Sequence, residues 1–355
     1  MASLNLEKAD EWLCAEGAPN AGVVVSSRAR YARNLTDHPF APRAKAAELA
    51  EISAKIERAV RASAKTADFI RLAISDLDPQ ERHYLVESHL ISAEMEKGGE
   101  GRMAFFSPDI RLSVLVNEED HLRLQRLEAG LRLHEVLEAL NALDDLLRGG
   151  LEYAYHEQFG YLTACPTNVG TGLRVSVMLH LPALVMTNTV EEIIQYVPQF
   201  GFTVRGFYGE NSEYLGDFFQ ISNEVTLGKT EDRICTELER VVLQIIEREE
   251  SARTRLFEEK RIKVEDTLWR SFGALTNSRM VSSRDALQML SHLRLGIEQG
   301  LFAGLTHAQL NRLMIDVQPA HLQFVEKAAL GEEARDVARA TFLRRRLTGL
   351  SRNSN

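Results

Sequence analysis

Alternating apolar and polar residues predict strands in the first two thirds of the chain. The longest such run covers residues 173–181, where every second residue is apolar. Arg174, Ser176, Met178 and His180 fall on the opposite side of that strand. Further strands are predicted at the start of 23–40, at 68–77, at 112–116 and within 202–228. The run at 173–181 is typical of a half-buried strand with one polar face.

A spacing of three to four residues between apolar positions predicts helices elsewhere. In 230–260, residues such as Ile234, Leu238 and Ile245 form one apolar side. The segment 261–355 has a helical pattern, is rich in arginine and shows no sign of a strand. Other helices are predicted at 1–20, 44–65, 79–92, from the acidic run at 117–121 onward to Leu147, and at 188–200. The pattern predicts a part that mixes strands and helices, followed by a separate helical domain.

Length and composition limit the class of protein. A chain of 355 residues is expected to form about two domains, and 45% hydrophobic residues suffice for real cores. The formal net charge of −9 argues against a nucleic-acid partner. No apolar run approaches the roughly 18 residues of a membrane span, and the start of the chain lacks the pattern of a secretory signal. The three scattered cysteines predict neither disulfides nor a zinc site, which fits a reducing cytoplasm.

Two arginines alternate in the first predicted strand. Arg28 and Arg30 share one face of it, directly after Ser26 and Ser27. Two guanidinium groups on one face can grip phosphate, although arginines on an edge strand can also serve only to block aggregation. The chain completes neither a P-loop nor a GxGxxG motif. A nucleotide-binding protein of this sequence would therefore have to hold phosphates with side chains.

Two other stretches contain reactive side chains. Three adjacent acids at 118–120 follow the strand at 112–116, and neighbouring carboxylates repel each other unless they are solvated or used. Cys165 lies in the polar turn CPTN, ahead of the strand with Arg174. A lone cysteine is more often a buried apolar residue than a reactive one, and an acidic turn can simply cap a helix. Each stretch alone is open to an ordinary structural interpretation.

Together, four motifs resemble the phosphagen (guanidino) kinases, which transfer phosphate between ATP and a guanidinium group. SSRAR, NEEDHLR, CPTNVGTGLR and RGFYGE stand in the order and spacing of that family, and the match covers about residues 22–252. The resemblance implies an α+β catalytic domain, an antiparallel sheet flanked by helices, that uses ATP and Mg²⁺ and has no metal site built from protein ligands. Such transfer depends on positioning and on stabilising phosphoryl charge, which suits arginines, carboxylates and a thiolate.

The resemblance also implies residue roles. Glu119 and Glu210 would hold the acceptor guanidinium from two loops, and Cys165 would lie beside it. Several arginines would bind the phosphates of ATP, and His89 would lie near the adenine. The full set of implied ATP-binding residues is Ser26, Ser27, Arg28, Ala29, Arg30, His89, Arg123, Arg174, Val175, Ser176, Val177, Met178, Arg205, Gly206, Phe207, Tyr208, Gly209 and Glu210.

Two departures narrow the resemblance to the bacterial protein-arginine kinases. Only a short extension precedes SSRAR, so the N-terminal helical domain of the small-phosphagen kinases is missing, and a C-terminal helical domain is present instead. We expect an N-terminal helical extension at 1–21, a catalytic domain at 22–252 and a helical domain at 253–355. The resemblance implies phosphorylation of arginine residues in proteins, which marks them for Clp-type proteolysis in a stress response.

The helical domain is expected to regulate the enzyme and to form a homodimer. ARDVARA resembles that family's RDxxRA motif, which implies that Arg335, Asp336, Arg339 and Ala340 form an allosteric phosphoarginine-binding pocket. The motif also fits a helix with an ordinary i,i+3 pair between Asp336 and Arg339. The implied partners are proteins with accessible arginine, an activator protein and a Clp-type unfoldase or protease. Two other functions stay open: a kinase for a small free guanidino compound, and a non-catalytic phosphoarginine-binding adaptor.

Overall fold

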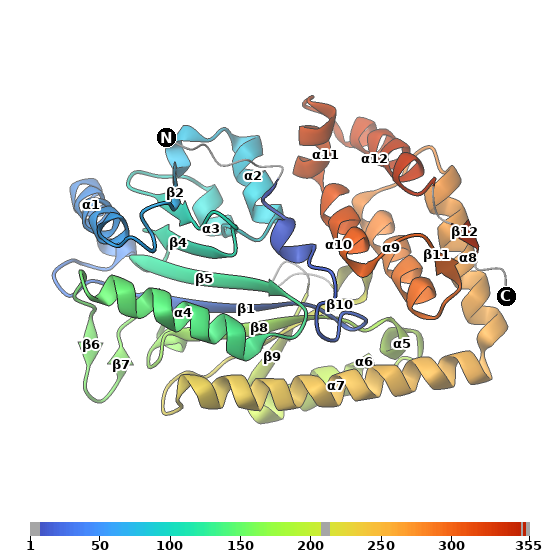
Figure 1. Ribbon diagram of the computed structural model, residues 1–355, viewed down its shortest axis with the longest axis horizontal. Helices are drawn as coiled ribbons and strands as arrows, with labels where there is room; N and C mark the ends of the chain where they lie inside the picture. Colours follow the sequence, from blue (N-terminus) through green and yellow to red (C-terminus); the bar gives the residue numbers. More distant parts are fainter. Residues whose placement is uncertain (1–7, 207–213, 349–350, 353–355) are drawn as a thin grey trace.

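An eight-stranded antiparallel sheet forms the centre of the first part of the chain (Figure 1). The computed structural model describes residues 8–206, 214–348 and 351–352. The strands are β1 (Val24–Arg33), β2 (Ile70–Ala73), β3 (Met103–Phe106), β4 (Leu112–Val116), β5 (Leu122–Ala129), β8 (Leu173–His180), β9 (Phe202–Arg205) and β10 (Phe218–Asn223). Their order is β2-β3-β4-β5-β1-β8-β10-β9. Strand β1 is central, between β5 and β8, so its arginines do not protect a sheet edge.

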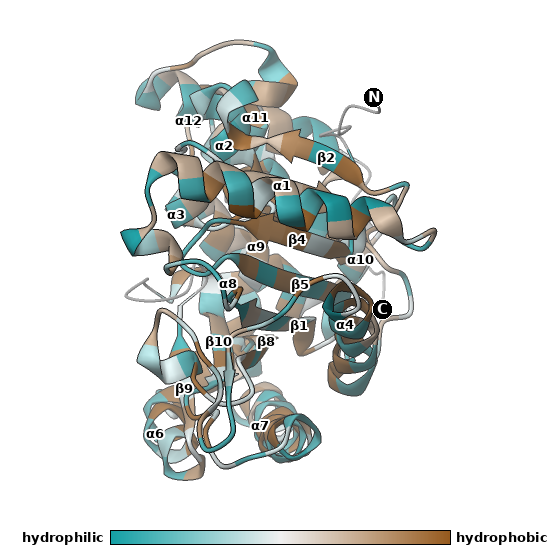
Figure 2. Cartoon of the chain, turned by 90° about the vertical axis from the view of Figure 1, so that its left-hand side faces the viewer, coloured by the Kyte–Doolittle hydropathy of each residue, from teal (hydrophilic) through white to brown (hydrophobic). Residues whose placement is uncertain are grey.

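Two long helices cover one face of this sheet. Helix α4 (Leu133–Arg148) packs on β1 and β5, and α7 (Glu231–Glu259) packs on β8 and β10. Tyr31 of β1 donates to Asn141 of α4 at 2.6 Å, and Val175 and Val177 of β8 are buried. Figure 2 shows β4 in brown, the colour of hydrophobic residues, inside the molecule. The apolar side chains of the alternating strands therefore face the helices, and the polar side chains point to the opposite face of the sheet.

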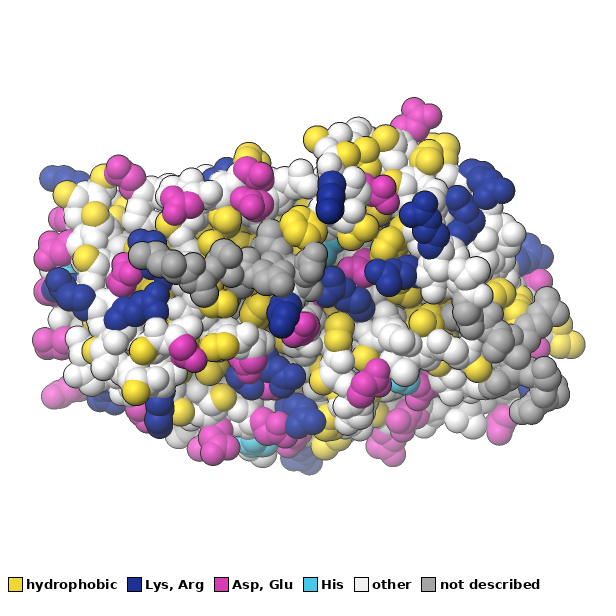
Figure 3. All heavy atoms as spheres, turned by 45° about the horizontal axis from the view of Figure 1, so that its top comes forward, with side chains coloured by type: hydrophobic (Ala, Val, Ile, Leu, Met, Phe, Trp, Pro, Cys, Tyr) yellow, Lys and Arg dark blue, Asp and Glu magenta, His cyan; other side chains and the backbone are white. Residues whose placement is uncertain are grey.

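The C-terminal part is helical and lies to the right in Figure 1. Its helices are α8 (Arg261–Asn277), α9 (Ser283–Glu298), α10 (His307–Asp316), α11 (Pro319–Glu326) and α12 (Glu332–Arg346). Contrary to the prediction, two short strands, β11 (Phe302–Ala303) and β12 (Ser351–Arg352), pair there; a two-residue strand is too short to show alternation. In Figure 3 several Lys and Arg side chains lie together on this part. No helix in the described residues is both long and apolar enough to cross a membrane.

Two of the predicted helices were wrong. The residues after the acidic run form strand β5, and α4 begins only at Leu133. The leucine spacing there fits a helix, but the first residues of β5 also alternate, and pairing with β1 and β4 decides the outcome. In the N-terminal extension, the described residues contain a 3-10 turn at Glu11–Leu13 in place of the helix. Trp12 and Leu13 are nevertheless buried.

The other predicted helices are present with shorter bounds. They are α1 (Ala46–Ala62), α2 (Pro79–Glu87) and α6 (Val190–Tyr196). Two short helices, α3 (Ala93–Glu96) and α5 (Pro182–Met186), were not predicted, and a small hairpin of β6 (Tyr155–His156) and β7 (Gly160–Tyr161) comes between α4 and β8 in the chain. Helix α2 ends before His89, which has a left-handed backbone with φ of 58°. The expected domain boundary at 252/253 falls inside the continuous helix α7, and the division into domains stays a prediction.

A buried ionic cluster joins the three parts of the chain. His321 of α11 lies 2.8 Å from Glu87 of α2 through Nδ1 and 3.0 Å from Asp10 through Nε2. Glu87 also accepts from the backbone N–H of Ala320. Burial alone would lower the pKa of His321, but the hydrogen bonds to the two carboxylates outweigh it and raise that pKa. A buried imidazolium between two carboxylates therefore holds the helical part against the sheet part.

Candidate active site

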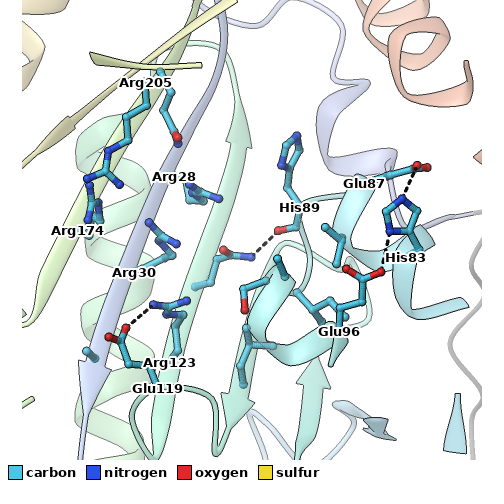
Figure 4. A pocket seen from close by; sticks show the side chains of 18 of the residues that line it. Arg28, Arg30, His83, Glu87, His89, Glu96, Glu119, Arg123, Arg174 and Arg205 are labelled. Carbon is cyan, nitrogen blue, oxygen red and sulfur yellow. Dashed lines mark hydrogen bonds and ion pairs between the residues drawn. The ribbon is translucent and has the colours of Figure 1, made fainter. Parts of the chain in front are cut away.

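Arginine side chains from four strands lie on the sheet face that the long helices leave free (Figure 4). Arg28 and Arg30 come from β1, Arg123 from β5, Arg174 from β8 and Arg205 from β9. The strand register explains the grouping, because Arg30 pairs directly with Arg174 across β1 and β8. Arg123 pairs with Ala32, two residues along the strand from Arg30. Alternation on each strand thus places the five guanidinium groups around one site.

These arginines line a cavity of about 740 Å³, together with Glu119, Cys165 and His89. Removal from water and, to a smaller extent, the neighbouring arginines together lower the pKa of Arg28 to about 10. The same causes hold the pKa of Arg30 well below its usual value. Cations that disfavour one another's charge in a partly dry site are stabilised by a bound polyanion. The electrostatics of the cavity therefore suit a triphosphate.

The helical part also contributes to the wall of this cavity. Arg284 and Leu287 of α9 line it, as do Gln318 and Pro319 at the start of α11. No sequence pattern indicated this contribution, because these residues are far from the sheet in the chain. The cavity is therefore a cleft between the two parts of the molecule, and its shape depends on how they pack.

Arg123 lies between two neighbouring carboxylates. Its guanidinium is 2.5 Å from Glu118 Oε1 and 3.7 Å from Glu119 Oε2. Glu118 is buried and also accepts from Ser92 Oγ at 2.5 Å, whereas the Glu119 side chain is 40% exposed. Sequence analysis assigned no role to Glu118. The structure gives the two acids different environments, with Glu119 open to the cavity and Glu118 held beneath it.

The loop with Cys165 is tied to the acidic loop. The backbone N–H of Ala164 donates to Asp120 Oδ1 at 2.7 Å, and the same oxygen accepts from Asn34 Nδ2 at 2.6 Å. The Cys165 Sγ lies 3.0 Å from Thr167 Oγ1 at the edge of the cavity. Burial raises the pKa of Asp120. This contact fixes the thiol relative to Glu119, which precedes Asp120 in the chain.

Arg33 supports the same loop from the helix-covered side of the sheet. Its guanidinium pairs with Asp144 of α4 at 2.8 Å and donates to the Thr171 carbonyl at 2.9 Å. The charge lies 3.6 Å from the ring centre of Tyr161 and 4.2 Å from that of Tyr31. Arg33 is fully buried, and its many partners offset the cost of that burial. Sequence alternation separates it from Arg28 and Arg30 but gives no indication of this role.

A small second cavity of about 50 Å³ adjoins the first at His89 and Arg28. Ser26, Ser176 and Met178 line it from the sheet. Trp12 and residues of α10, such as Ile315, close it. Burial lowers the pKa of His89 to about 4, and its ring lies edge-on to Trp12 with 6.5 Å between centroids. A neutral, mostly apolar recess next to a cationic cluster suits a base attached to phosphates.

The remaining residues of the predicted ATP site divide into two groups. Alternation turns the side chains of Ser27, Ala29, Val175 and Val177 to the helix-covered face, where they are buried, so only their backbone could meet a nucleotide. Gly206 follows β9 and is buried. Phe207, Tyr208, Gly209 and Glu210 lie outside the described residues. The role of Glu210 as second carboxylate therefore stays a prediction.

The residues of the predicted regulatory pocket lie on α12. Arg339 is buried and donates to the carbonyls of Val317 and Val281, each at 2.8 Å. It also bonds Asp336 at 2.5 Å, which is the i,i+3 pair considered from the sequence. Arg335 donates to the Leu330 carbonyl, and Ala340 is buried. These four residues do not line the cleft, and their role in binding phosphoarginine stays a prediction.

The described residues offer no group of three or more His, Cys, Asp and Glu side chains that could hold a metal ion. One oxygen of the buried Glu118 carboxylate, Oε2, has no hydrogen-bond partner within the described part of the chain. Mg²⁺ in nucleotide enzymes is held mainly by phosphates and waters, with one or two carboxylates. The site therefore fits a magnesium ion that arrives with a nucleotide.

Two family models match most of the chain. The model described as ATP:guanido phosphotransferase, C-terminal catalytic domain, matches residues 51–252, and the model described as Protein-arginine kinase McsB C-terminal domain matches residues 261–355. A curated protein-arginine kinase from Geobacillus stearothermophilus is 46% identical over 338 residues, which are 95% of this chain and 93% of that protein. Another, from Moorella thermoacetica, is 43% identical over 350 residues, which are 98% and 100% of the two chains.

Solved structures of phosphagen kinases share the fold. A lombricine kinase matches with a TM-score of 0.59 and 24% identity, covering 70% of this chain and 71% of that one. The duplicated taurocyamine kinase from Schistosoma mansoni, with bound transition-state-analogue components, matches with a TM-score of 0.61 and 25% identity. This chain spans 36% of that duplicated protein. The fold and the matched catalytic domain define an ATP:guanidino phosphotransferase. Within that class, the identity over almost the whole chain shows that the protein belongs to the protein-arginine kinase family.

Proposed function

We propose that the protein transfers the γ-phosphoryl group of ATP to the guanidino group of arginine residues in other proteins. The observation that supports this most strongly is the single cavity in which a cluster of mutually repelling arginines lies next to Glu119 and Cys165. The names of the curated relatives support protein arginine as the acceptor. The cleft also supports it, because an arginine on another protein must reach the reacting centre from outside.

Each group in the cavity has a role in this transfer. Arg28, Arg30 and Arg174 bind the triphosphate, and Arg123 and Arg205 approach it from the neighbouring strands. The acceptor guanidinium lies against Glu119 and Cys165, with Glu210 as a second carboxylate. A guanidino nitrogen attacks the γ-phosphorus while the bond from that phosphorus to the bridging oxygen of ADP breaks, and the nitrogen gives up a proton to a carboxylate. Arginines that are in place before the reaction stabilise the phosphoryl charge without reorganisation.

Magnesium would bind with the nucleotide in this account. The ion would neutralise phosphate charge, and Glu118, whose Oε2 has no partner among the described residues, would supply a carboxylate that helps to hold it. The protein side chains would orient the acceptor and exclude water from the cleft. Arg123 helps here too, because its contact with Glu118 keeps that carboxylate fixed.

We further propose a cellular role for this activity. The phosphorylated proteins would be marked for a Clp-type unfoldase or protease in a cytoplasmic stress response, with an activator protein controlling the enzyme. Cys14, Cys165 and Cys235 are all free, which supports a reducing compartment. The helical part would form a homodimer, for which exposed apolar residues such as Ile262 and Met280 are available. Arg335, Asp336, Arg339 and Ala340 would bind phosphoarginine and regulate the site.

Mass spectrometry after incubation with Mg-ATP tests the proposed function. The acceptors would be an unfolded basic protein and, separately, free arginine, under conditions that preserve acid-labile phosphate. We expect phosphate on arginine side chains of the protein, at a rate well above that for the free amino acid. Phosphorylation of free arginine alone would point to a small-guanidine kinase. Binding of phosphoarginine without any transfer would point to an adaptor.

A further inference from the structure

An exposed apolar surface borders the Cys165 end of the cleft. Tyr155 and Phe159 of the β6–β7 hairpin are 59% and 48% exposed, and Val225 and Leu227, between β10 and α7, are 47% and 50% exposed. We call these four residues the apolar rim. Single exposed apolar residues are common on proteins, but residues gathered from two loops at the mouth of a site are typical of a binding surface.

The apolar rim is continuous with the cavity. The backbone N–H of Tyr161, in the hairpin, donates to the Gly170 carbonyl at 2.8 Å, and that glycine leaves no room for a side chain against Leu227. The hydroxyl of Thr226, between the two exposed residues of its loop, donates to the Thr167 carbonyl at 3.1 Å. Thr167 and Cys165 line the cavity. The hairpin, the CPTN turn and the loop before α7 therefore form one surface that leads to the thiol.

The charge around the apolar rim is negative. Glu157 of the hairpin, Glu224 and Asp232 are exposed, and none of them forms an ion pair with a described residue. The basic residues nearby do not cancel these charges, since Lys229 and Arg233 share one carboxylate, Glu237, at 2.7 Å each and leave one positive charge against the three exposed acids. A chain segment that lies on this surface meets apolar side chains and uncompensated carboxylates together. The complementary segment is apolar and basic.

We propose that the apolar rim binds the residues that flank the target arginine in an extended segment of a protein substrate, and that it favours apolar and basic flanking residues. This inference rests on the proposed function, because the arginine of that segment must enter the cleft beside Cys165. Folded proteins bury most apolar segments, so such a surface would select arginines in unfolded or locally opened chains. The rim thereby determines which arginines are modified, while the cavity determines the chemistry.

Steady-state kinetics with three acceptors test the rim. The variant Val225→Ser/Leu227→Ser and the variant Phe159→Ser would be compared with the wild type. The acceptors would be a blocked single arginine, a short peptide with one arginine among Leu and Lys, and a peptide of equal length with one arginine among Gly and Ser. We expect kcat/KM for the Leu/Lys peptide to fall about tenfold, through KM, because half-buried aliphatic contacts are lost. Rates with the other two acceptors should change less than about twofold.

Controls separate this inference from its alternatives. Leu243→Ser, at a 48% exposed apolar residue on α7, should leave all three rates unchanged. An equal loss with every acceptor, or no loss with the Leu/Lys peptide, would overturn the role of the rim. If the rim variants form smaller oligomers than the wild type and their rates fall in proportion to that loss of oligomer, the rim is instead an interface between copies of the chain. A wild type that phosphorylates no acceptor contradicts the proposed function itself.

Discussion

Asp120 Oδ1 accepts a hydrogen bond from the backbone N–H of Ala164 at 2.7 Å, and this contact joins the acidic loop to the loop that carries Cys165. Because it couples the positions of Glu119 and Cys165, we predict that Asp120→Ala lowers kcat by about tenfold to a hundredfold, as expected when reacting groups shift by about an ångström. The affinity for ATP, measured by calorimetry, should change little.

Asp120→Asn is the matched control for this positioning role. The amide oxygen can accept the same bonds from Ala164 and Asn34, while the amide nitrogen occupies the place of Oδ2, which has no partner in the described part of the structure. We therefore expect kcat within about threefold of the wild type, since the geometry is preserved. A loss as large as that of Asp120→Ala would show that the charge of Asp120, rather than its geometry, is needed.

The arginine cluster should destabilise the protein when no anion is bound. Arg30→Met removes one buried positive charge among like charges, and we predict that it raises the free energy of unfolding by about 1–2 kcal/mol without ligand. The same variant should lose most of the rise in melting temperature that Mg-ATP gives the wild type. Thermal denaturation with and without Mg-ATP measures both effects. Arg240→Met, at an exposed arginine of α7, is the control and should alter neither quantity.

Arg33 should matter for stability more than for binding. Arg33→Ala leaves Asp144 buried without its partner, and we predict a loss of about 3–5 kcal/mol in the free energy of unfolding. Arg33→Lys keeps the charge but loses the planar contact with Tyr161 and one of the two donors to Asp144, so its loss should be smaller. Urea denaturation measures both variants. An equal loss for the two would contradict the role assigned to the guanidinium plane.

The ionic cluster at His321 predicts a pH-dependent stability. The raised pKa of His321 means that its contribution is complete below its unfolded value of 6.5 and is lost as pH rises through the folded pKa. Burial alone would raise the pKa of Glu87, but hydrogen bonds from His321 and His83 lower it to about 2. Its contribution is therefore complete above the unfolded value of 4.5 and is lost at lower pH.

The cluster should accordingly stabilise the protein most between about pH 5 and pH 6.5. Urea denaturation of the wild type and of His321→Gln at pH 5.5 and pH 9 measures the effect. We expect the difference in the free energy of unfolding to be larger at pH 5.5. His156→Gln, at an exposed histidine of the hairpin, should show no such dependence. A difference that grows toward pH 9 would contradict a charged His321 in the folded protein.

The sequence predicted those features of the site that follow from local alternation. Arg28 and Arg30 are two residues apart in one predicted strand, so their common face could be inferred from the sequence. Alternation likewise placed Arg174 on the polar face of its own strand. Strand β5 was missed because its leucines also fit a helical spacing, and only its pairing between β1 and β4 distinguishes the two. Propensity is weak where tertiary pairing decides the element.

Contacts between distant segments could not be predicted. The bond from Ala164 to Asp120 and the ion pair of Arg33 with Asp144 join residues that are 44 and 111 positions apart. Nothing in the pattern around either residue specifies its partner. The wall that α9 and α11 contribute to the cleft depends on packing between the two parts, including the buried contact of His321 with Glu87, and no sequence pattern indicated it.

The central claim is that Glu119 acts on the acceptor in the cavity and does not hold the nucleotide. Its most direct test is Glu119→Gln, assayed for ATP affinity by calorimetry and for phosphoarginine on an unfolded protein by mass spectrometry. We predict an ATP affinity within about threefold of the wild type and a rate lower by at least about a hundredfold. A variant that keeps its rate, or one that loses phosphorylation only because it no longer binds ATP, would contradict the account.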